Sequence, residues 1–297
     1  MFIVLEVLLL TLKIIAALAV DFYHLFVPYP KKDVSGKVVL ITGAGHGLGR
    51  SFALHFARLG STLVLWDVNT EGNEETAKQV RELGTEAYTF TVDVRKKDVV
   101  YETAKSVQDK VGTVDILFNN AGVISGEEIC NLTDSQIVRT FEVNAISHFW
   151  ILKAFLPDMI KRNEGHIVTI ASQAGKFGTP RMSDYCASKY AAVGLGESLH
   201  SELRVLGRAG VKTTLVCPFF IDTGMFTNLS FKTDSILKQD DAVSTIVDGV
   251  LRNKREIVIP SKHNIRIMFK AFAPFSVYDL IEDFTAINVG SQSGKYD

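Results

Sequence analysis

A tyrosine and a lysine four positions apart, Tyr185 and Lys189, carry the strongest chemical signal in this sequence. On a helix, this spacing places both side chains on one face, one turn apart. Two unit charges about 4 Å apart interact by roughly 4 kcal/mol at an effective dielectric constant near 20. A lysine ammonium beside the tyrosine hydroxyl would therefore lower the tyrosine pKa from about 10 to about 7. A tyrosine that titrates near neutrality is a usable general base, which predicts proton removal from an alcohol.

A serine strengthens this hypothesis, because Ser172 lies thirteen positions before Tyr185. We expect its hydroxyl to bind the substrate oxygen that Tyr185 deprotonates. Together, Ser172, Tyr185 and Lys189 suit oxidation of an alcohol, or the reverse reduction, with a hydride passing to or from a cofactor. The same tyrosine–lysine spacing also occurs in ordinary surface pairs on helices, so the prediction depends on the rest of the chain.

A glycine-rich turn between a strand and a helix predicts a dinucleotide site. The apolar run 38–41 predicts a buried parallel strand, the turn 42–49 follows it, and residues 50–59 predict a helix. Glycines allow a tight turn and let the backbone approach a pyrophosphate at the helix N-terminus. The cofactor contacts expected in this turn come from Gly43, His46, Gly47, Leu48 and Gly49.

The choice between NAD and NADP depends on Asp67, which ends the second predicted strand, 24 positions after Gly43. This spacing is near that of a carboxylate that binds the adenosine ribose hydroxyls. A carboxylate there repels a 2′-phosphate, and His46 occupies the loop position where a basic residue would receive one. The sequence therefore favours NAD. The alternative is that Asp67 is only a turn residue at the end of a strand.

Strands and helices continue to alternate along the chain. We predict strands at 62–66, 87–92, 115–118, 166–170, 213–217 and 257–259, and helices at 71–83, 97–111, 133–156 and 183–206. Asp93 and Val94 follow the third strand, where Asp93 either meets the adenine edge or forms a turn. Asn120, Ala121 and Gly122 follow the fourth strand and are expected to line the cofactor. The alternation predicts an α/β protein with a Rossmann-type, doubly wound parallel sheet of about seven strands.

The N-terminal segment predicts a hydrophobic membrane-anchor helix. Residues 2–20 are almost wholly apolar, and nineteen helical residues reach about 28 Å, close to the hydrocarbon thickness of a bilayer. An aromatic stretch and two lysines follow, which favours an anchor over residues 1–30 with the catalytic domain in the cytosol. The alternatives are a cleaved signal peptide and a buried core helix. Glu6 and Lys13 share a face, so the helix either spans the membrane or lies in one leaflet.

Composition narrows the class of protein. The chain has 297 residues, which suits one α/β domain of the larger kind, and its net charge of −1 gives no indication of a nucleic-acid partner. The three cysteines, Cys130, Cys186 and Cys217, form neither a disulfide framework nor a metal pattern, which fits a reducing compartment. We expect Cys186 to be a small buried hydrophobic residue.

Taken in order, these motifs resemble those of the short-chain dehydrogenase/reductases. The resemblance covers about residues 34–260 and rests on the turn 42–49, the segment 119–122, Asn144, Ser172 and the stretch 185–189. It implies that Tyr185 is the base, that Lys189 lowers its pKa and binds the nicotinamide ribose, and that Ser172 orients the substrate. It also implies a proton-relay position for Asn144, whose alternative is an ordinary polar residue or a helix bend.

The resemblance also implies two further cofactor contacts. The chain departs from the family's pattern at one position. The resemblance implies that Thr223 contacts the nicotinamide carboxamide and that Pro218 lies beside the cofactor. The family commonly has Pro-Gly after the sixth strand, whereas this chain has Pro218-Phe219. We expect the bulk of Phe219 to shape the nicotinamide pocket or the access of substrate.

Within the family, the chain is similar to the membrane- and lipid-droplet-associated branch of 17β-hydroxysteroid dehydrogenases types 11 and 13 and epidermal retinol dehydrogenases. The apolar N-terminus and the segments 65–67, 141–144 and 217–220 carry this similarity. It implies NAD-dependent oxidation of a 17β-hydroxysteroid or of retinol by a homodimer at the endoplasmic reticulum membrane or the lipid droplet. The alternatives are an NADP-dependent carbonyl reductase and a lipid-droplet or membrane interaction protein whose catalytic site is incidental.

The last part of the chain, residues 261–297, is an apolar extension with interleaved basic residues. An amphipathic segment at a membrane surface is one interpretation, and a dimer contact or a core helix is the other. The loop 226–237, which precedes the last predicted strand, is expected to cover the substrate cleft, and the alternative is an ordinary surface loop.

Overall fold

The protein is described here from a computed structural model that covers residues 2–226, 229–285 and 287–290. Parts of three predicted segments lie outside the described residues. These are residue 1 of the anchor, residues 227–228 of the loop over the cleft, and residues 286 and 291–297 of the C-terminal extension.

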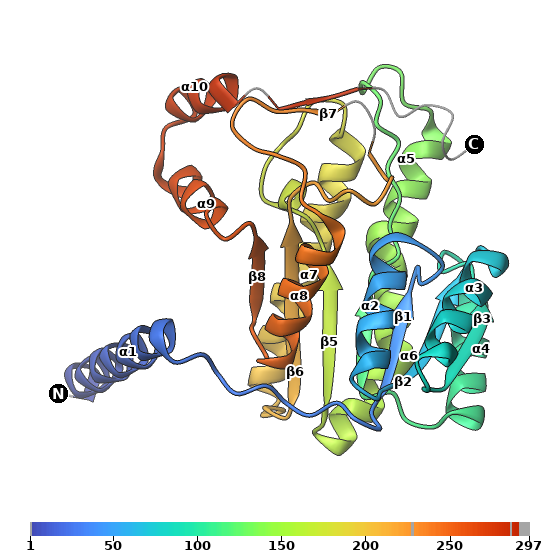
Figure 1. The fold of residues 1–297 in the computed structure, drawn as a ribbon. Helices are drawn as coiled ribbons and strands as arrows, with labels where there is room; N and C mark the ends of the chain where they lie inside the picture. Colours follow the sequence, from blue (N-terminus) through green and yellow to red (C-terminus); the bar gives the residue numbers. More distant parts are fainter. Residues whose placement is uncertain (1, 227–228, 286, 291–297) are drawn as a thin grey trace.

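One seven-stranded sheet forms the centre of the molecule, with all of its strand pairs parallel (Figure 1). Its order is β3-β2-β1-β4-β5-β6-β8. The strands are β1 (Val38–Thr42), β2 (Thr62–Asp67), β3 (Ala87–Thr91), β4 (Ile116–Asn119), β5 (Gly165–Ile170), β6 (Val211–Pro218) and β8 (Glu256–Ile259). The order reverses between β1 and β4, so a crevice opens at the carboxyl ends of these strands. The predicted Rossmann-type sheet is confirmed.

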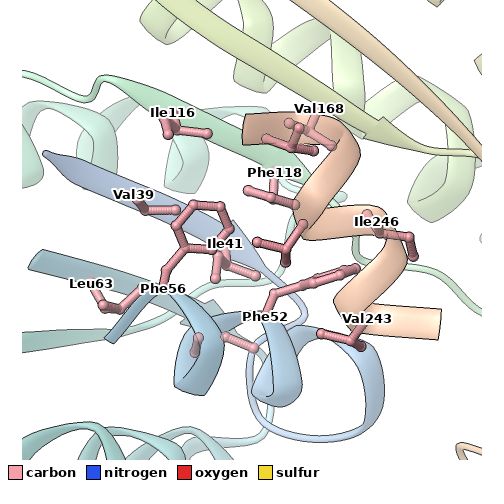
Figure 2. Packing of buried hydrophobic residues seen from close by; sticks show 14 of the residues in the cluster. Val39, Ile41, Phe52, Phe56, Leu63, Ile116, Phe118, Val168, Val243 and Ile246 are labelled. Atoms are coloured by element: carbon pink, nitrogen blue, oxygen red, sulfur yellow. The ribbon is translucent and has the colours of Figure 1, made fainter. Parts of the chain in front are cut away.

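Helices cover both faces of the sheet. One face carries α2 (Gly47–Arg58), α3 (Thr70–Glu82) and α8 (Gln239–Leu251), and the other carries α4 (Lys97–Lys110), α6 (Ser147–Arg162) and α7 (Ser183–Val205). Figure 2 shows the first layer, in which Phe52 and Phe56 of α2 and Ile246 of α8 pack against the strand residues Ile41 and Phe118. These side chains are fully buried, which fixes α2 and its N-terminal turn against the sheet.

The predicted helix 133–156 is longer than expected and is interrupted. It consists of α5 (Asp134–Phe141), a π-helical turn η1 (Glu142–Ile146) and α6. Asn144 lies in η1, where its amide is drawn into hydrogen bonds with the backbone of Val123 and with Ser188. A π-turn inserts one extra residue into a helix and often marks a functional position. The predicted disturbance of the helix at Asn144 is therefore present.

The N-terminal helix α1 (Phe2–Phe26) projects away from the sheet (Figure 1). It is long and apolar enough to cross a membrane, and its described side chains are exposed except that of His24, which is partly covered. The alternative of a buried core helix is therefore wrong, whereas membrane insertion stays a prediction. Helix α8 was not predicted from the sequence.

The C-terminal part forms α9 (His263–Phe272), α10 (Phe275–Thr285) and a short strand β9 (Asn288–Val289), which pairs antiparallel with β7 (Leu229–Ser230). The large apolar side chains exposed on the two helices are Ile265, Met268, Phe269, Phe272, Phe275, Val277, Leu280 and Phe284. The core-helix alternative is therefore wrong for α9 and α10. Both helices lie on the same side of the view as α1 (Figure 1).

Candidate active site

A cavity of about 600 Å³ opens at the carboxyl ends of the strands. Its lining includes every residue predicted to contact the cofactor: Gly43, His46, Gly47, Leu48, Gly49, Asp67, Asp93, Val94, Asn120, Ala121, Gly122, Tyr185, Lys189, Pro218 and Thr223. Ser172 lines the same cavity. Asn144 does not, because it is fully buried behind Gly122 and Val123. One cavity thus brings together residues that lie up to 180 positions apart, from Gly43 to Thr223.

The glycine turn is packed so tightly that side chains have no room in it. Gly43 has a φ of +66°, and a Cβ on Gly49 would lie 2.0 Å from the carbonyl oxygen of Gly43. The side-chain amide of Asn120 donates to the carbonyl oxygen of Thr42 at 2.7 Å and ties the turn to the end of β4. His46 precedes α2 without a side-chain cap, and residues 46–49 at the N-terminus of α2 line the cavity. This cradle fits a pyrophosphate group.

The carboxylate of Asp67 lines the cavity at the end of β2. It accepts hydrogen bonds from the backbone N–H groups of Gly45 and Asn69, both at 2.8 Å. The turn role is thus observed, and the ribose contact stays a prediction. A carboxylate held in the wall fits a ribose diol and disfavours a 2′-phosphate.

Asp93 lines the cavity, but its carboxylate binds Arg95 at 2.7 Å and also accepts the backbone N–H of Arg95. The side-chain hydrogen bond from Arg95 lowers the pKa of Asp93 below its ordinary value. The structure therefore supports the turn alternative for Asp93, and a contact with adenine stays a prediction.

Tyr185 and Lys189 lie one turn apart on α7, and only 5% and 3% of their surfaces are exposed. The Lys189 ammonium is 5.6 Å from the centre of the Tyr185 ring and donates to the carbonyl oxygen of Ile170 at 2.9 Å. Burial lowers the pKa of Lys189 to about 8. The lysine is therefore mainly charged at pH 7, as required for an electrostatic effect on the tyrosine.

Ser172 joins the ends of two strands beside these residues. Its hydroxyl accepts the backbone N–H of Ala174 at 3.0 Å and lies 3.5 Å from the carbonyl oxygen of Pro218, to which it donates. The hydroxyl is therefore held at the cavity wall between β5 and β6.

Asn144 acts on the site through the backbone around it. Its amide donates to the carbonyl oxygen of Val123 at 2.9 Å and to Ser188 Oγ at 3.0 Å. Ser188 in turn donates to the carbonyl oxygen of Tyr185 at 2.7 Å. Asn144 therefore holds the turn of α7 that carries Tyr185. The water-mediated link from Asn144 to Lys189 stays a prediction, although both side chains approach Gly122.

The wall opposite the glycine turn is aromatic. Phe219 and Phe220, at the end of β6, line the cavity together with Met225 and Phe226, and the Phe226 ring lies edge-on to Tyr185 at 6.1 Å. The position where the family commonly has glycine thus contributes an apolar surface to the cavity. Thr223 faces the glycine turn, because a Cβ on Gly47 would lie 3.5 Å from the Thr223 Cβ.

Sequence reasoning missed a histidine beside the site. His148 lies one turn after Asn144, is 1% exposed, and has no hydrogen-bond partner for either ring nitrogen among the described residues. Burial, and then the charge of Lys189, lower the pKa of His148 to about 3, so the ring is neutral at pH 7. Its only sequence signal was the four-residue spacing from Asn144. Cys186 is buried, and burial raises its thiol pKa, as expected of a packing residue.

Other cavity residues carried no signal, because only the topology brings them to the site. Phe177 follows the short helix η2 (Gln173–Gly175), and Arg266 lies on α9 with its guanidinium 4.7 Å from the Phe177 ring centre. Gln173, which follows Ser172, also lines the cavity. None of these residues belongs to a motif.

The sequence matches those of known proteins over most of its length. Residues 37–234 match the family described as short chain dehydrogenase. Human 17-beta-hydroxysteroid dehydrogenase 13 is 44% identical over 272 residues, which are 92% of this chain and 91% of that protein. Human epidermal retinol dehydrogenase 2 is 47% identical over 264 residues, which are 88% of this chain and 85% of that protein.

Solved structures share the fold. A short chain dehydrogenase/reductase from Burkholderia phymatum, in complex with NAD, superposes with a TM-score of 0.74 at 29% identity, covering 81% of this chain and 94% of that one. A metagenomic short-chain oxidoreductase in complex with NADP gives a TM-score of 0.66 at 27% identity, covering 77% and 98%. The two structures therefore differ in the cofactor that they bind.

Proposed function

The chain belongs to the short chain dehydrogenase family, and from this premise we propose that it oxidises a lipophilic alcohol with NAD, using Tyr185 as the general base. One observation supports this most strongly. The glycine cradle and Asp67 share a single cavity with Ser172, Tyr185 and Lys189. An oxidoreductase needs this arrangement, because the cofactor and the alcohol must meet within it.

In this reaction the alcohol loses its hydroxyl proton and a hydride from the carbinol carbon. Tyr185 takes the proton, and the Lys189 ammonium stabilises the tyrosinate that removes it. Ser172 donates to the substrate oxygen and orients it towards Tyr185. NAD, when bound, supplies the hydride acceptor. Asn144 keeps Tyr185 in place through Ser188.

The substrate class follows from the aromatic wall and from the relatives. Phe219, Phe220 and Phe226 present an apolar surface next to Tyr185, which suits a large hydrophobic alcohol. Two similar proteins are named for steroid and retinol dehydrogenation. We therefore propose a 17β-hydroxysteroid or retinol as the substrate, yielding the ketone or the aldehyde.

The proposal predicts turnover of retinol or estradiol by the detergent-solubilised full chain with NAD, and a much lower rate with NADP. Asp67→Ser removes the carboxylate that repels a 2′-phosphate, so we expect the NAD-to-NADP ratio of kcat/KM to fall by about tenfold or more. The measurement is absorbance at 340 nm together with chromatography of the retinal or estrone formed.

Asn69→Ser is the matched control, since Asn69 lines the same part of the cavity without a charge. It should leave the cofactor ratio near that of the wild type. An equal rate with NADP in the wild type would contradict the role of Asp67. Absence of NAD binding would contradict the function itself.

We also propose that the chain consists of an anchor (1–30), a catalytic domain (34–260) and a C-terminal extension (261–297). The exposed apolar helix α1 and the apolar faces of α9 and α10 support membrane or lipid-droplet attachment. Basic residues interleave with these faces, and Lys270 is one of them. The attachment would bring the enzyme to the surface in which lipophilic alcohols dissolve.

A cytosolic catalytic domain predicts that both glycosylation sequons stay unmodified. One begins at Asn131, which is exposed, and the other at Asn228, which lies outside the described residues. Glycosidase treatment should leave the electrophoretic mobility unchanged, and protease should digest the domain in intact microsomes. A lumenal glycoprotein in the same microsomes serves as the control. Protection from protease, or a mobility shift, would contradict this orientation.

A further inference from the structure

A buried histidine joins two segments that flank the cavity. His263, the first residue of α9, is 5% exposed. Its Nδ1 lies 2.8 Å from Gln173 Oε1, and its Nε2 lies 3.0 Å from Asp234 Oδ1. Gln173 directly follows Ser172. The three residues Gln173, His263 and Asp234 are called the clamp below.

The hydrogen bonds around the clamp define the protons on the ring. Gln173 donates through Nε2 to the carbonyl oxygen of Ile259 at 2.9 Å, so its Oε1 faces His263 as an acceptor. Because both ring nitrogens then face acceptor oxygens, both need an N–H. A ring with two N–H groups is an imidazolium cation.

The partner carboxylate is ionised. Lys262 Nζ lies 2.7 Å from the same oxygen of Asp234 that His263 contacts. Burial raises the pKa of Asp234, but hydrogen bonds from Lys262 and His263 lower it, and the result lies below the ordinary value. The other ring in contact with His263 is that of Phe219, edge-on at 5.0 Å, and it carries no charge. The clamp is therefore a charge-assisted pair, about twice as strong as a neutral hydrogen bond.

The clamp acts on a segment beside the cavity, of which Met225 and Phe226 line the cavity itself. We call residues 225–226 and 229–237 the flap. Phe226 of the flap lies edge-on to Tyr185, and Phe231 packs on Phe219 and Phe220 at 5.3 and 5.2 Å. One end of the flap pairs with β9, and Leu237 at the other end bonds to the backbone of Phe220. Asp234 belongs to the flap, and His263 links it to Gln173, which directly follows Ser172.

We propose that His263 is a positioning residue for alcohol oxidation, which as an imidazolium fastens the flap beside the substrate cavity. It touches neither substrate nor cofactor. Its effect reaches the substrate through Asp234 and the flap residue Phe226. Loosening the clamp enlarges and hydrates the apolar side of the cavity, so it weakens the binding of the alcohol more than it slows the proton transfer. The kinetic part of this inference rests on the proposed function, whereas the state of the ring does not.

The first test needs no turnover. The full-length protein in detergent, labelled with ¹⁵N-histidine, should show at pH 7 one ring with two protonated nitrogens, and His263→Phe should remove that signal. Asp234→Asn removes the opposite charge beside Nε2 while Lys262 stays, so the ring should lose one proton and one nitrogen should change to the shift of an unprotonated site. A wild-type His263 ring with one unprotonated nitrogen would overturn the proposal.

The second test separates KM from kcat. His263→Phe leaves Gln173 Oε1 without its donor, so we expect KM for the alcohol to rise about tenfold, with kcat and the KM for NAD within about threefold. Asp234→Asn removes the negative charge that strengthens the hydrogen bond to Nε2, so KM for the alcohol should also rise, by a smaller factor of about threefold.

His200→Phe is the matched control, because His200 also donates or accepts one hydrogen bond, with Thr213, but does not line the cavity. It should leave all three constants unchanged. An unchanged KM in His263→Phe, with the other controls intact, would overturn the positioning role. If His263→Phe does not fold, the wild-type and Asp234→Asn spectra together still decide whether the ring is charged. If no alcohol is turned over, the proposed function fails while the ring spectrum remains a separate result.

Discussion

Tyr185→Phe is expected to lower kcat for alcohol oxidation by about 10³-fold, while the affinity for NAD stays within about threefold of the wild type. The substitution removes one oxygen from a side chain that is 5% exposed, so the packing against Phe226 is kept. What is lost is the group that accepts the hydroxyl proton of the alcohol. Stopped-flow or steady-state formation of NADH measures kcat, and quenching of protein fluorescence by NAD measures the affinity for NAD.

Tyr190→Phe is the matched control on the same helix. Tyr190 is 43% exposed, and its hydroxyl accepts a hydrogen bond from Lys270 away from the cavity lining. It should retain wild-type activity. A Tyr185→Phe enzyme with more than about one third of the wild-type rate would contradict the general-base role. If a cellular function of the protein survives Tyr185→Phe unchanged, the alternative of a membrane interaction protein gains support instead.

The parts of the fold that depend on local sequence patterns could be predicted from the sequence. The run 38–41, the glycine turn after it and Asp67 obey a spacing that the backbone geometry of a strand–turn–helix unit imposes. The parallel strands are buried on both faces, so each reads as a short apolar run. Helix α8 was also within reach, because Val243, Ile246, Val247 and Val250 recur at helical spacing.

Other features depend on contacts that no local pattern encodes. Asn144 lies in the π-turn, and its amide contacts Val123 and Ser188, the latter 44 positions away. The clamp joins Gln173 to His263 across 90 positions, and neither residue belongs to a recognisable motif. The charge on His263 follows only from the direction of the Gln173 amide, which the carbonyl oxygen of Ile259 defines. Periodicity and spacing are properties of segments, whereas these contacts arise only after the segments have assembled.

The same distinction explains why the reaction is easier to infer than the substrate. The groups proposed for proton transfer lie on one helix and at one strand end, where spacing predicts their geometry. The substrate wall instead combines the end of β6, the flap and α9, as Phe219, Phe226 and Arg266 illustrate. Its shape depends on how those segments pack on one another, so steroid and retinol are not separated by any one motif.

Gly49→Ala is expected to weaken NAD binding by about 100-fold or more, because a displacement of about 1 Å at a binding site costs effects of this size. The new Cβ would lie 2.0 Å from the carbonyl oxygen of Gly43 and 2.9 Å from the Asn120 amide nitrogen. Backbone cannot yield as a flexible side chain does, so the turn must move away from α2. That movement also breaks the bond from Asn120 to Thr42. Isothermal titration measures the weaker binding of NAD, and thermal unfolding measures how far the displaced turn lowers the stability.

Gly194→Ala is the matched control, since a Cβ there meets nothing within 4 Å and the residue lies on an exposed part of α7. Alanine is favoured over glycine inside a helix by about 1 kcal/mol, so this variant should be at least as stable as the wild type and should bind NAD equally well. The contrast isolates position from residue type, because both variants add the same methyl group. Normal NAD affinity in a folded Gly49→Ala protein would mean that the pyrophosphate does not lie against this turn, and the cofactor site would then have to be sought elsewhere in the cavity.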